Sequence, residues 1–439
     1  MTEKKQRSSN FELLRILLML LIIAHHYVVN SGIAAVDGPI FANPTAPHAL
    51  YLLLWGAWGK IGINCFVLLS SWFMCEKTIS LRKFLKLLLE FMFYRIVIAL
   101  VFWLTGYEKI TLNGVLNVLI PIRELADSFA ETYLVFFLFI PFLNILIRHL
   151  TERQHLRLLA LLCFVYVFFG TFRPLFSVTM NYISWFMVLF LIASYIRRYP
   201  KRFFEGAKRW GLIAGSFVLL SALSVVACAF VSKRIEKTYY FVLVTDVNTL
   251  LAVCTGIAVL LFFRNMRMKP NRVINAIAAT VFGVFCIHAS SDTMRRWLWQ
   301  DTLKNVEYFY KPIGYVHIIG AVVGIFTVCA LIDSLRARLI EKPFFAMLDR
   351  KLPGVISRWQ RFEDRLMENG AKHKGGLHES VDSELRIGIP DGRFDEGTPE
   401  MHDGDRERRN DRFTAAEDAE RSRHSGDCHD NRSVCGRFT

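Results

Sequence analysis

The chain has 439 residues, of which 53% are hydrophobic, and it carries a formal net charge of +15 at pH 7. Soluble globular domains contain roughly 45–50% apolar residues, and here the apolar residues gather in long blocks, which excludes an ordinary soluble domain. The positive charge does not indicate nucleic-acid binding, because basic loops that face anionic membrane lipids account for it.

About ten of these blocks have the length of membrane spans, since ~20 apolar residues cross ~30 Å of hydrocarbon. The first block is too long for the core of a signal peptide and lacks a small-residue cleavage site, so we expect it to remain as a helix. The sequence therefore predicts an all-α fold, a polytopic transmembrane bundle, with spans at residues 11–30, 50–74, 84–105, 131–149, 156–171, 181–196, 210–231, 240–263, 273–290 and 314–335.

The charges of the connecting loops predict the orientation of the bundle. The loops at 76–86, 148–157, 197–209 and 264–272 are rich in Lys and Arg, whereas the loop at 31–49 contains neither. Short cytoplasmic loops of membrane proteins carry the excess of Lys and Arg. We therefore expect both termini to lie in the cytoplasm.

The composition changes near residue 350. Residues 1–350 form the predicted membrane domain, whereas residues 351–439 are rich in charged residues, Gly and Ser and contain no long apolar block. Such a composition is typical of disorder, so we predict a disordered cytoplasmic tail. The spacing of the histidines and cysteines in this tail fits no standard zinc site, and we predict no bound metal.

The first span carries ionisable residues, which are costly in hydrocarbon and therefore indicate function. Arg15 and His26 are eleven residues apart, which at ~100° per residue places them on one helix face, ~16 Å apart along the axis. Glu12 lies one turn before Arg15, where it can orient the guanidinium. His25 points ~100° away from His26, so we expect the two histidines to have different roles.

The chemistry of this pair suits two tasks. A guanidinium binds phosphate in bidentate fashion, so Arg15 is a candidate for binding a phosphorylated donor from the cytoplasm. An imidazole accepts a proton from a hydroxyl near neutral pH, so His26 is the candidate base. In the structural alternative, Arg15 extends to the lipid headgroups and His26 hydrogen-bonds a neighbouring helix. Spacing alone does not decide between these interpretations.

Other polar residues extend the candidate set. Arg82 and Lys86 lie one turn apart where the third span begins, and they either bind a donor or face headgroups. Glu90 and Arg95 lie deeper and need partners. The predicted catalytic residues are thus Arg15 and His26, and the predicted substrate-binding residues are Glu12, Ser70 in the second span, Arg82, Lys86, and His288 at the outer end of the ninth span.

Two early segments resemble the acyltransferase-3 family, the integral membrane acyltransferases that modify bacterial cell-surface glycans. In LRILLMLLIIAHH, Arg15 and His26 match the family's signature of Arg, ten residues and His on the first helix. The segment GINCFVLLSSWFM is similar to the family's second-helix segment, with Val67 in place of the second Phe and Ser71 in place of Gly.

Two later segments extend the resemblance to residues 9–348. ATVFGVFCIH resembles the family's segment of Ser-Phe-Gly, an aromatic residue, an apolar residue and Ile-His, with Thr280 at the Ser position and Cys286 where Leu is common. LIDSLRARLIEKPFFAML resembles the closing helix, whose Glu-x-Pro end falls at Glu341 and Pro343.

The resemblance implies transfer of an acyl group, most often acetyl from acetyl-CoA, to a hydroxyl of an envelope polysaccharide or lipid-linked sugar at the bacterial plasma membrane. It implies acyl-CoA, the glycan and membrane lipids as partners, and no permanently bound cofactor. Two alternatives remain: a glycan exporter, and a sensor or scaffold that acts through the tail. Transporters break matched helices with Pro or Gly, and Pro141 is the only proline well inside a predicted span, which favours the enzyme.

Overall fold

The computed structural model describes most of the predicted membrane domain and little of the predicted tail. The helices of the described part are α-, 3₁₀- and π-helices, and no strand occurs there, which confirms the all-α prediction. The predicted disordered tail falls almost wholly outside this part and stays a prediction. The described residues are 8–76, 81–123, 125, 128–172, 180–244, 246–351, 354 and 361.

Seven segments of the described chain are long and apolar enough to cross a membrane. The protein is therefore a multi-pass membrane protein, as predicted. The segments are Ser9–Val29 (α1), Pro47–Met74 (α3, Pro47–Gly56; α4, Gly59–Met74), Leu81–Leu104 (α5), Phe129–His149 (α7), Glu152–Thr171 (α8, Glu152–Leu162; η1, Cys163–Phe168; α9, Phe169–Thr171), Ala207–Ile235 (α11) and Gly314–Lys351 (α17, Gly314–Arg336; η4, Ala337–Glu341; α18, Lys342–Lys351).

An eighth span exists if a bent helix pair, Arg272–His288 and Asp292–Thr302, is counted as one; its two arms enclose a bend of 94°. The first arm contains α13 (Arg272–Ala278) and α14 (Val281–His288), and the second contains α15 (Asp292–Arg296) and η3 (Trp297–Thr302). The remaining helices are shorter: α2 (Pro39–Ala42), α6 (Leu112–Leu119), α10 (Tyr182–Arg198), η2 (Arg202–Phe204), α12 (Leu250–Asn265) and α16 (Asn305–Phe309).

The predicted count of ten spans is not confirmed. Two predicted spans form the helices α10 and α12, with only 17 and 16 residues. The prediction that a helix begins at residue 240 is wrong, because α12 begins at Leu250. The end of the preceding turns is buried at Val247, Asn248 and Thr249. Side chains satisfy the backbone there: Asn64 donates to the carbonyl of Val247 at 2.6 Å, and the hydroxyl of Thr171 accepts from the Leu250 N–H at 2.8 Å. Irregular backbone at membrane depth is tolerated when it is buried in this way.

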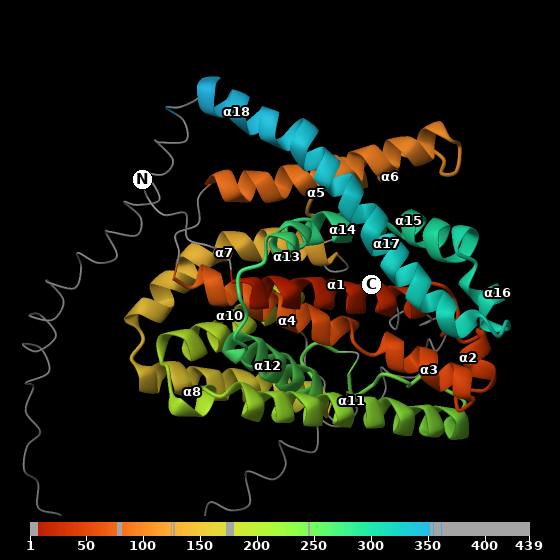
Figure 1. The fold of residues 1–439 in the computed structure, drawn as a ribbon, viewed down its shortest axis with the longest axis horizontal. Coiled ribbons are helices and arrows are strands. Elements are labelled where there is room, and N and C mark those ends of the chain that lie inside the picture. Colours follow the sequence, from red (N-terminus) through yellow and green to blue (C-terminus); the bar gives the residue numbers. More distant parts are fainter. Residues whose placement is uncertain are drawn as a thin grey trace, which may run out of the picture. The chain divides into compact units, whose positions relative to one another are not determined.

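The helix α1 is the centre of the packing. It contacts α3, α4, α12, α13, α14 and α17, and Figure 1 shows it running through the middle of the bundle. Leu14, Ile23, Ala24 and Val28, which point to different sides of α1, are all buried. A helix that is apolar all round is one enclosed by others, so Glu12, His25 and His26 are buried inside the protein, whereas Arg15 is 25% exposed.

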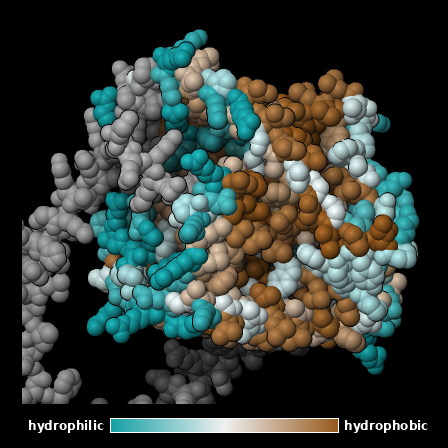
Figure 2. All heavy atoms as spheres, viewed as in Figure 1, coloured by the Kyte–Doolittle hydropathy of each residue, from teal (hydrophilic) through white to brown (hydrophobic). Residues whose placement is uncertain are grey.

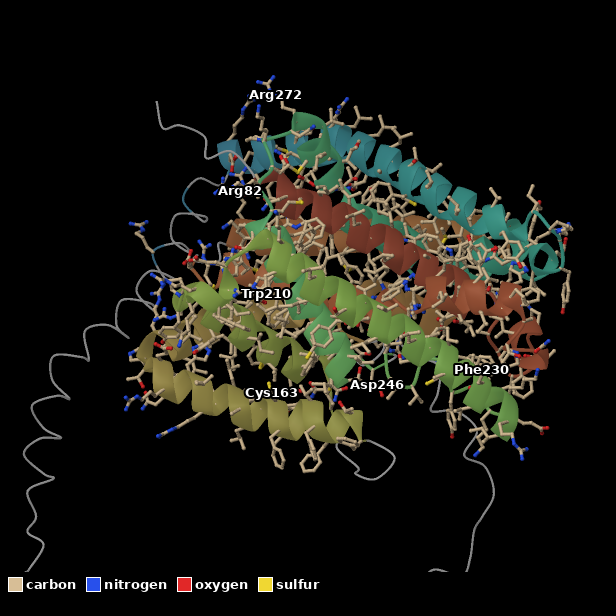
Figure 3. All side chains as sticks on the ribbon, turned by 60° about the horizontal axis from the view of Figure 1, so that its bottom comes forward. Arg82, Cys163, Trp210, Phe230, Asp246 and Arg272 are labelled. Atoms are coloured by element: carbon tan, nitrogen blue, oxygen red, sulfur yellow. The ribbon has the colours of Figure 1, made fainter. Side chains whose placement is uncertain are left out.

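The outer surface of the bundle is apolar where lipid would contact it. Leu212, Leu219 and Phe230 on α11 and Val316 and Leu331 on α17 are exposed. Figure 2 shows an apolar area across the middle of one face, with hydrophilic side chains on both sides of it and more of them at the left. Arg82 and Arg272, which come from two of the basic loops, lie at the same end of the bundle (Figure 3).

Two helix breaks lie close to the histidines of α1. The first separates α3 from α4 at Ala57 and Trp58, and the second separates α14 from α15 after His288. Neither break contains proline, whereas α7 continues through Pro141.

Candidate active site

His26 and His288 lie next to each other inside the bundle. His26 belongs to α1 and His288 ends α14, and the distance from His26 Nδ1 to His288 Nε2 is 3.1 Å. Both residues are buried, with exposed fractions of 3% and 0%. The ring of Phe285 lies 6.4 Å from that of His26. The structure thus joins two predicted site residues, 262 positions apart, in one hydrogen bond.

The hydrogen bonds of this pair determine where the protons lie. His288 Nδ1 is 2.6 Å from the carbonyl oxygen of Val284, and a carbonyl only accepts, so Nδ1 carries the proton. In neutral His288, Nε2 is then an acceptor, and His26 Nδ1 must donate to it. Neutral His26 consequently has its lone pair on Nε2. The hydrogen bond of the His26 ring to the described residues is made by Nδ1, which leaves Nε2 available as a base.

His25 has a different environment, in agreement with its predicted different role. Its Nδ1 donates to the carbonyl oxygen of Gly56 at 2.5 Å, at the end of α3 where the helix breaks. Its ring also fills the space beside Gly59, where any Cβ atom would overlap it. His25 therefore holds α1 against the break between α3 and α4.

Two cationic side chains act electrostatically on His26. They are Lys60, in the first turn of α4, and Arg295, on α15. Lys60 has an exposed fraction of 5%, and its Nζ lies 3.4 Å from the Tyr182 hydroxyl. Arg295 forms an ion pair with the exposed Asp292. Positive charge beside a neutral base favours a reaction in which negative charge develops.

Arg15 lies towards the other end of α1. Its Nη1 contacts both carboxylate oxygens of Glu12, at 3.0 and 3.1 Å, as the spacing predicted. The side chain is 25% exposed and its guanidinium lies 5.9 Å from the centre of the Phe73 ring. Arg15 also acts electrostatically on Tyr133, and Ser70 is a further polar neighbour of that tyrosine. The structure thus brings Arg15, Glu12 and Ser70 into one neighbourhood.

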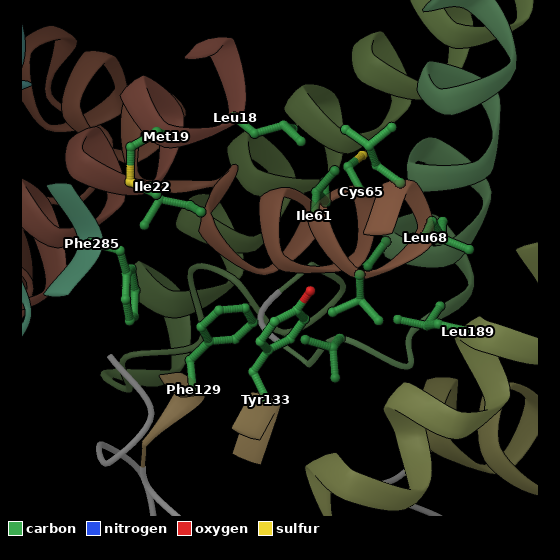
Figure 4. Close-up of a cluster of buried hydrophobic side chains, with 14 of the residues drawn as sticks. Leu18, Met19, Ile22, Ile61, Cys65, Leu68, Phe129, Tyr133, Leu189 and Phe285 are labelled. Carbon is green, nitrogen blue, oxygen red and sulfur yellow. The ribbon is translucent and has the colours of Figure 1, made fainter. Parts of the chain in front are cut away.

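Three aromatic rings connect the two ends of this face. Tyr133 stacks on Phe129 with ring centres 5.7 Å apart, Phe129 contacts Phe285 at 5.1 Å, and Phe285 reaches His26. We call Tyr133, Phe129 and Phe285 the aromatic row. Figure 4 shows it facing the side chains of Leu18, Met19 and Ile22 on α1 and of Ile61, Cys65 and Leu68 on α4.

Arg82 and Lys86 on α5 form ion pairs with residues of η4 and α18. Arg82 binds Asp349 at 2.9 Å and Lys86 binds Glu341 at 2.6 Å. A cavity of about 340 Å³ lies between these helices, lined by Arg82, Lys86, Glu341, Lys342, Phe345, Ala346 and Asp349. Within the described chain, neither cation forms a hydrogen bond or ion pair with Arg15 or His26, so the geometry does not connect them to the central site.

The deeper charges Glu90 and Arg95 have partners, as expected. Arg336 binds Glu90 at 3.2 Å and Asp333 at 2.8 Å, and Arg95 pairs with Glu131. These buried networks join α5 to α17 and α7. No group of three or more His, Cys, Asp and Glu side chains in the described part is arranged to hold a metal ion.

The comparison with known families identifies the chain. The model of the acyltransferase domain of the acyltransferase-3 family matches residues 8–334, more than half of the 439 residues. The chain belongs to the acyltransferase-3 family. No curated protein and no solved structure matches it. As a member of the acyltransferase-3 family, it is a membrane acyltransferase.

The structure explains the late segment that resembles the acyltransferase-3 family. Gly283 packs against Asp333, and a Cβ atom at this position would overlap the carboxylate. Asp333 in turn accepts from the Tyr94 hydroxyl at 2.8 Å. The glycine therefore lets α14 approach α17 closely, and this contact positions His288 one turn and a half later. The family match ends at residue 334, so Glu341 and Pro343 lie beyond it.

Sequence analysis of this acyltransferase-3 member missed Lys60, Arg295 and Tyr133. Lys60 had the same signal as Arg15, a cation inside an apolar block, and applying that criterion to the second span would have found it. Arg295 follows the predicted ninth span, where a basic residue carries no special signal. Tyr133 is one of many aromatic residues, and only its contact with Ser70 and Arg15 distinguishes it.

Proposed function

We propose that this protein is an O-acyltransferase that moves an acetyl group from acetyl-CoA to a hydroxyl of an envelope polysaccharide or lipid-linked sugar. The observation that carries the proposal is the hydrogen bond from His26 Nδ1 to His288 Nε2. It leaves the lone pair of His26 on Nε2, where a base that activates a hydroxyl needs it. Membership of the acyltransferase-3 family supplies the reaction class.

The reaction follows from this arrangement. His26 Nε2 takes the proton of the acceptor hydroxyl while the hydroxyl oxygen attacks the thioester carbonyl carbon, and the carbonyl electrons move to oxygen. His288 orients the ring of His26 by accepting from its Nδ1–H, which also stabilises the protonated ring. The oxyanion then reforms the carbonyl and expels the CoA thiolate, which recovers the proton from His26. The products are the acetyl ester and CoA thiol.

The donor approaches from the Arg15 end in this proposal. Arg15 is only half-buried and its fork suits a phosphate oxygen pair, with Glu12 as the group that orients it. The thioester has to reach His26, ~16 Å away along α1. The aromatic row lies between the two, so the acyl-bearing arm of CoA passes along Phe129 and Phe285.

The proposed location is the bacterial plasma membrane, with both termini in the cytoplasm. The grouping of Arg82 and Arg272 at one end of the bundle supports this orientation, because short basic loops stay on the cytoplasmic side. Arg15 then lies towards the cytoplasm and His26 towards the outer side, where an envelope glycan is available.

Glycan export remains a second candidate, because one observation favours it. Transporters bind substrates at discontinuous helices near the middle of the membrane, and both helix breaks lie beside His25 and His288. An exporter changes the amount of glycan outside the cell, whereas an acyltransferase changes its mass.

Mass spectrometry of surface glycans tests the proposal. Cells that carry the gene, its His26→Gln variant or a deletion are compared for glycans heavier by one acetyl group. We expect the acetylated species only with the unchanged gene, at equal amounts of total glycan. Loss of total glycan without any change in mass would instead identify an exporter.

A further inference from the structure

Lys60 is a buried cation beside the candidate base. It stands in the first turn of α4, and its ammonium lies 3.4 Å from the Tyr182 hydroxyl and 5.6 Å from the centre of that ring. Asp246, on the buried turns before α12, acts on it as an opposite charge. Besides α4 itself, α10 with Tyr182 and the turns with Asp246 therefore act on this side chain.

The packing of α4 on α1 places Lys60 at the level of the histidines. Gly59 lies against the His25 ring, and a Cβ atom at Gly62 would lie 3.1 Å from Ile22. Lys60 follows Gly59 in the chain and is therefore one residue from the contact with His25. The electrostatic effect of Lys60 on both His25 and His26 agrees with this position.

Packing alone does not account for a lysine at this point. A charged residue near the middle of a membrane helix costs about 2.5–3.5 kcal/mol on insertion scales, and methionine would fill a similar volume without that cost. The opposite charge of Asp246 gives no general gain in stability, because even buried ion pairs often contribute no more than apolar residues of equal size. A charge kept at this cost is a candidate for function.

The reaction geometry gives this charge a role. A hydroxyl that is hydrogen-bonded to His26 Nε2 lies about 3 Å from it, and the carbonyl carbon under attack lies about 3 Å further on. The oxyanion therefore forms within roughly 6 Å of His26 Nε2. Lys60 and Arg295 both act electrostatically on His26, so their charges also act on an oxyanion at this place.

We propose that Lys60 is a further catalytic residue, whose ammonium stabilises the oxyanion that forms on the thioester carbonyl. The inference rests on the proposed acyl transfer and assigns a second group to the same site. The Nζ of Lys60 is already held beside the Tyr182 hydroxyl at 3.4 Å, so little reorganisation is needed when the oxyanion forms.

Kinetics of Lys60 variants test the assignment. Lys60→Met removes the charge at similar volume, Lys60→Arg keeps it, and Lys208→Met, on the exposed start of α11, is the matched control. The rate of CoA thiol release from acetyl-CoA is measured in membrane vesicles from expressing cells, with thermal unfolding of the purified protein as the check of folding.

We expect Lys60→Met to lower kcat by about 10²- to 10³-fold, as removal of one oxyanion donor does, with little change in KM for acetyl-CoA. Lys60→Arg should retain far more activity, and Lys208→Met should match the unchanged protein.

The outcomes separate this inference from the proposed function. If the unchanged protein releases no CoA thiol above that from vesicles without it, the proposed acyl transfer is wrong. If it is active and Lys60→Met folds and keeps its kcat, only the role of Lys60 is refuted. If Lys60→Met does not fold, Lys60→Gln replaces it in the same comparison. Failure of both neutral variants to fold would show that the charge is structural and would overturn the inference.

Discussion

The role assigned to His288 can be tested by removing its acceptor atom. His288→Leu leaves the Nδ1–H of His26 without the partner that lies at 3.1 Å in the structure. An unpaired buried donor costs about 1–3 kcal/mol. In this variant the cost destabilises the reactive tautomer of His26, which has its proton on Nδ1 and its lone pair on Nε2. Because 1.36 kcal/mol corresponds to a factor of ten in rate, we expect kcat to fall about 5- to 150-fold.

His288→Gln is the informative counterpart. Its amide oxygen can accept from His26, and its amide nitrogen can donate to the Val284 carbonyl, which lies 2.6 Å from His288 Nδ1. We therefore expect kcat within a few-fold of the unchanged protein. CoA thiol release at saturating acetyl-CoA, normalised to folded protein, gives both values. Equal losses in the two variants, or no loss in His288→Leu, would refute the tautomer argument. His155→Leu, which removes a buried histidine that bonds the Leu191 carbonyl at 3.1 Å, is the control for lost packing.

Three further predictions concern the first helix and the orientation. His26→Gln should leave the protein folded and able to bind CoA yet lower acyl transfer by on the order of 10²-fold or more. His25→Gln should have a mild effect on acyl transfer, because an amide can still donate to Gly56. Equal small effects in the two variants would leave His26 without a catalytic role. Arg15→Lys should raise the KM for acetyl-CoA roughly tenfold, because the planar fork is lost, and unchanged activity at limiting acetyl-CoA would exclude Arg15 from the donor site. A cysteine at the exposed position Asp37 should react with an impermeant reagent added outside intact cells and one at Glu205 should not, and the reverse pattern would contradict the orientation.

Local features of the site could be predicted because they depend on one helix. Glu12 and Arg15 are three residues apart and form the expected ion pair at 3.0 Å. The different environments of His25 and His26 likewise follow from ~100° of rotation per residue. The need for partners at Glu90 and Arg95 followed from the cost of unpaired charge in a membrane, and the structure supplies Arg336 and Glu131.

Long-range features could not be predicted in this way. Nothing in the periodicity of either helix shows that His288 meets His26, because the contact depends on how α14 packs between α1 and α17. The turns before α12 are apolar enough to resemble a span, and they are irregular because Asn64 and Thr171, far away in the sequence, satisfy their backbone. The helix breaks contain no proline, and the Gly56 and Gly59 that flank the first break fit close helix packing equally well, so composition alone did not identify the breaks.

The aromatic row constrains how donor and base can meet. Tyr133, Phe129 and Phe285 contact one another in sequence between Arg15 and His26, and Figure 4 shows the rings of Phe129 and Tyr133 side by side. In the proposed reaction, a donor arm that follows this row has to displace these rings. Rotation of aromatic side chains requires no change of backbone, whereas α1, enclosed by other helices, cannot move without disturbing the His26–His288 bond. In the proposed reaction, the row can therefore open for the donor while His26 stays aligned on His288.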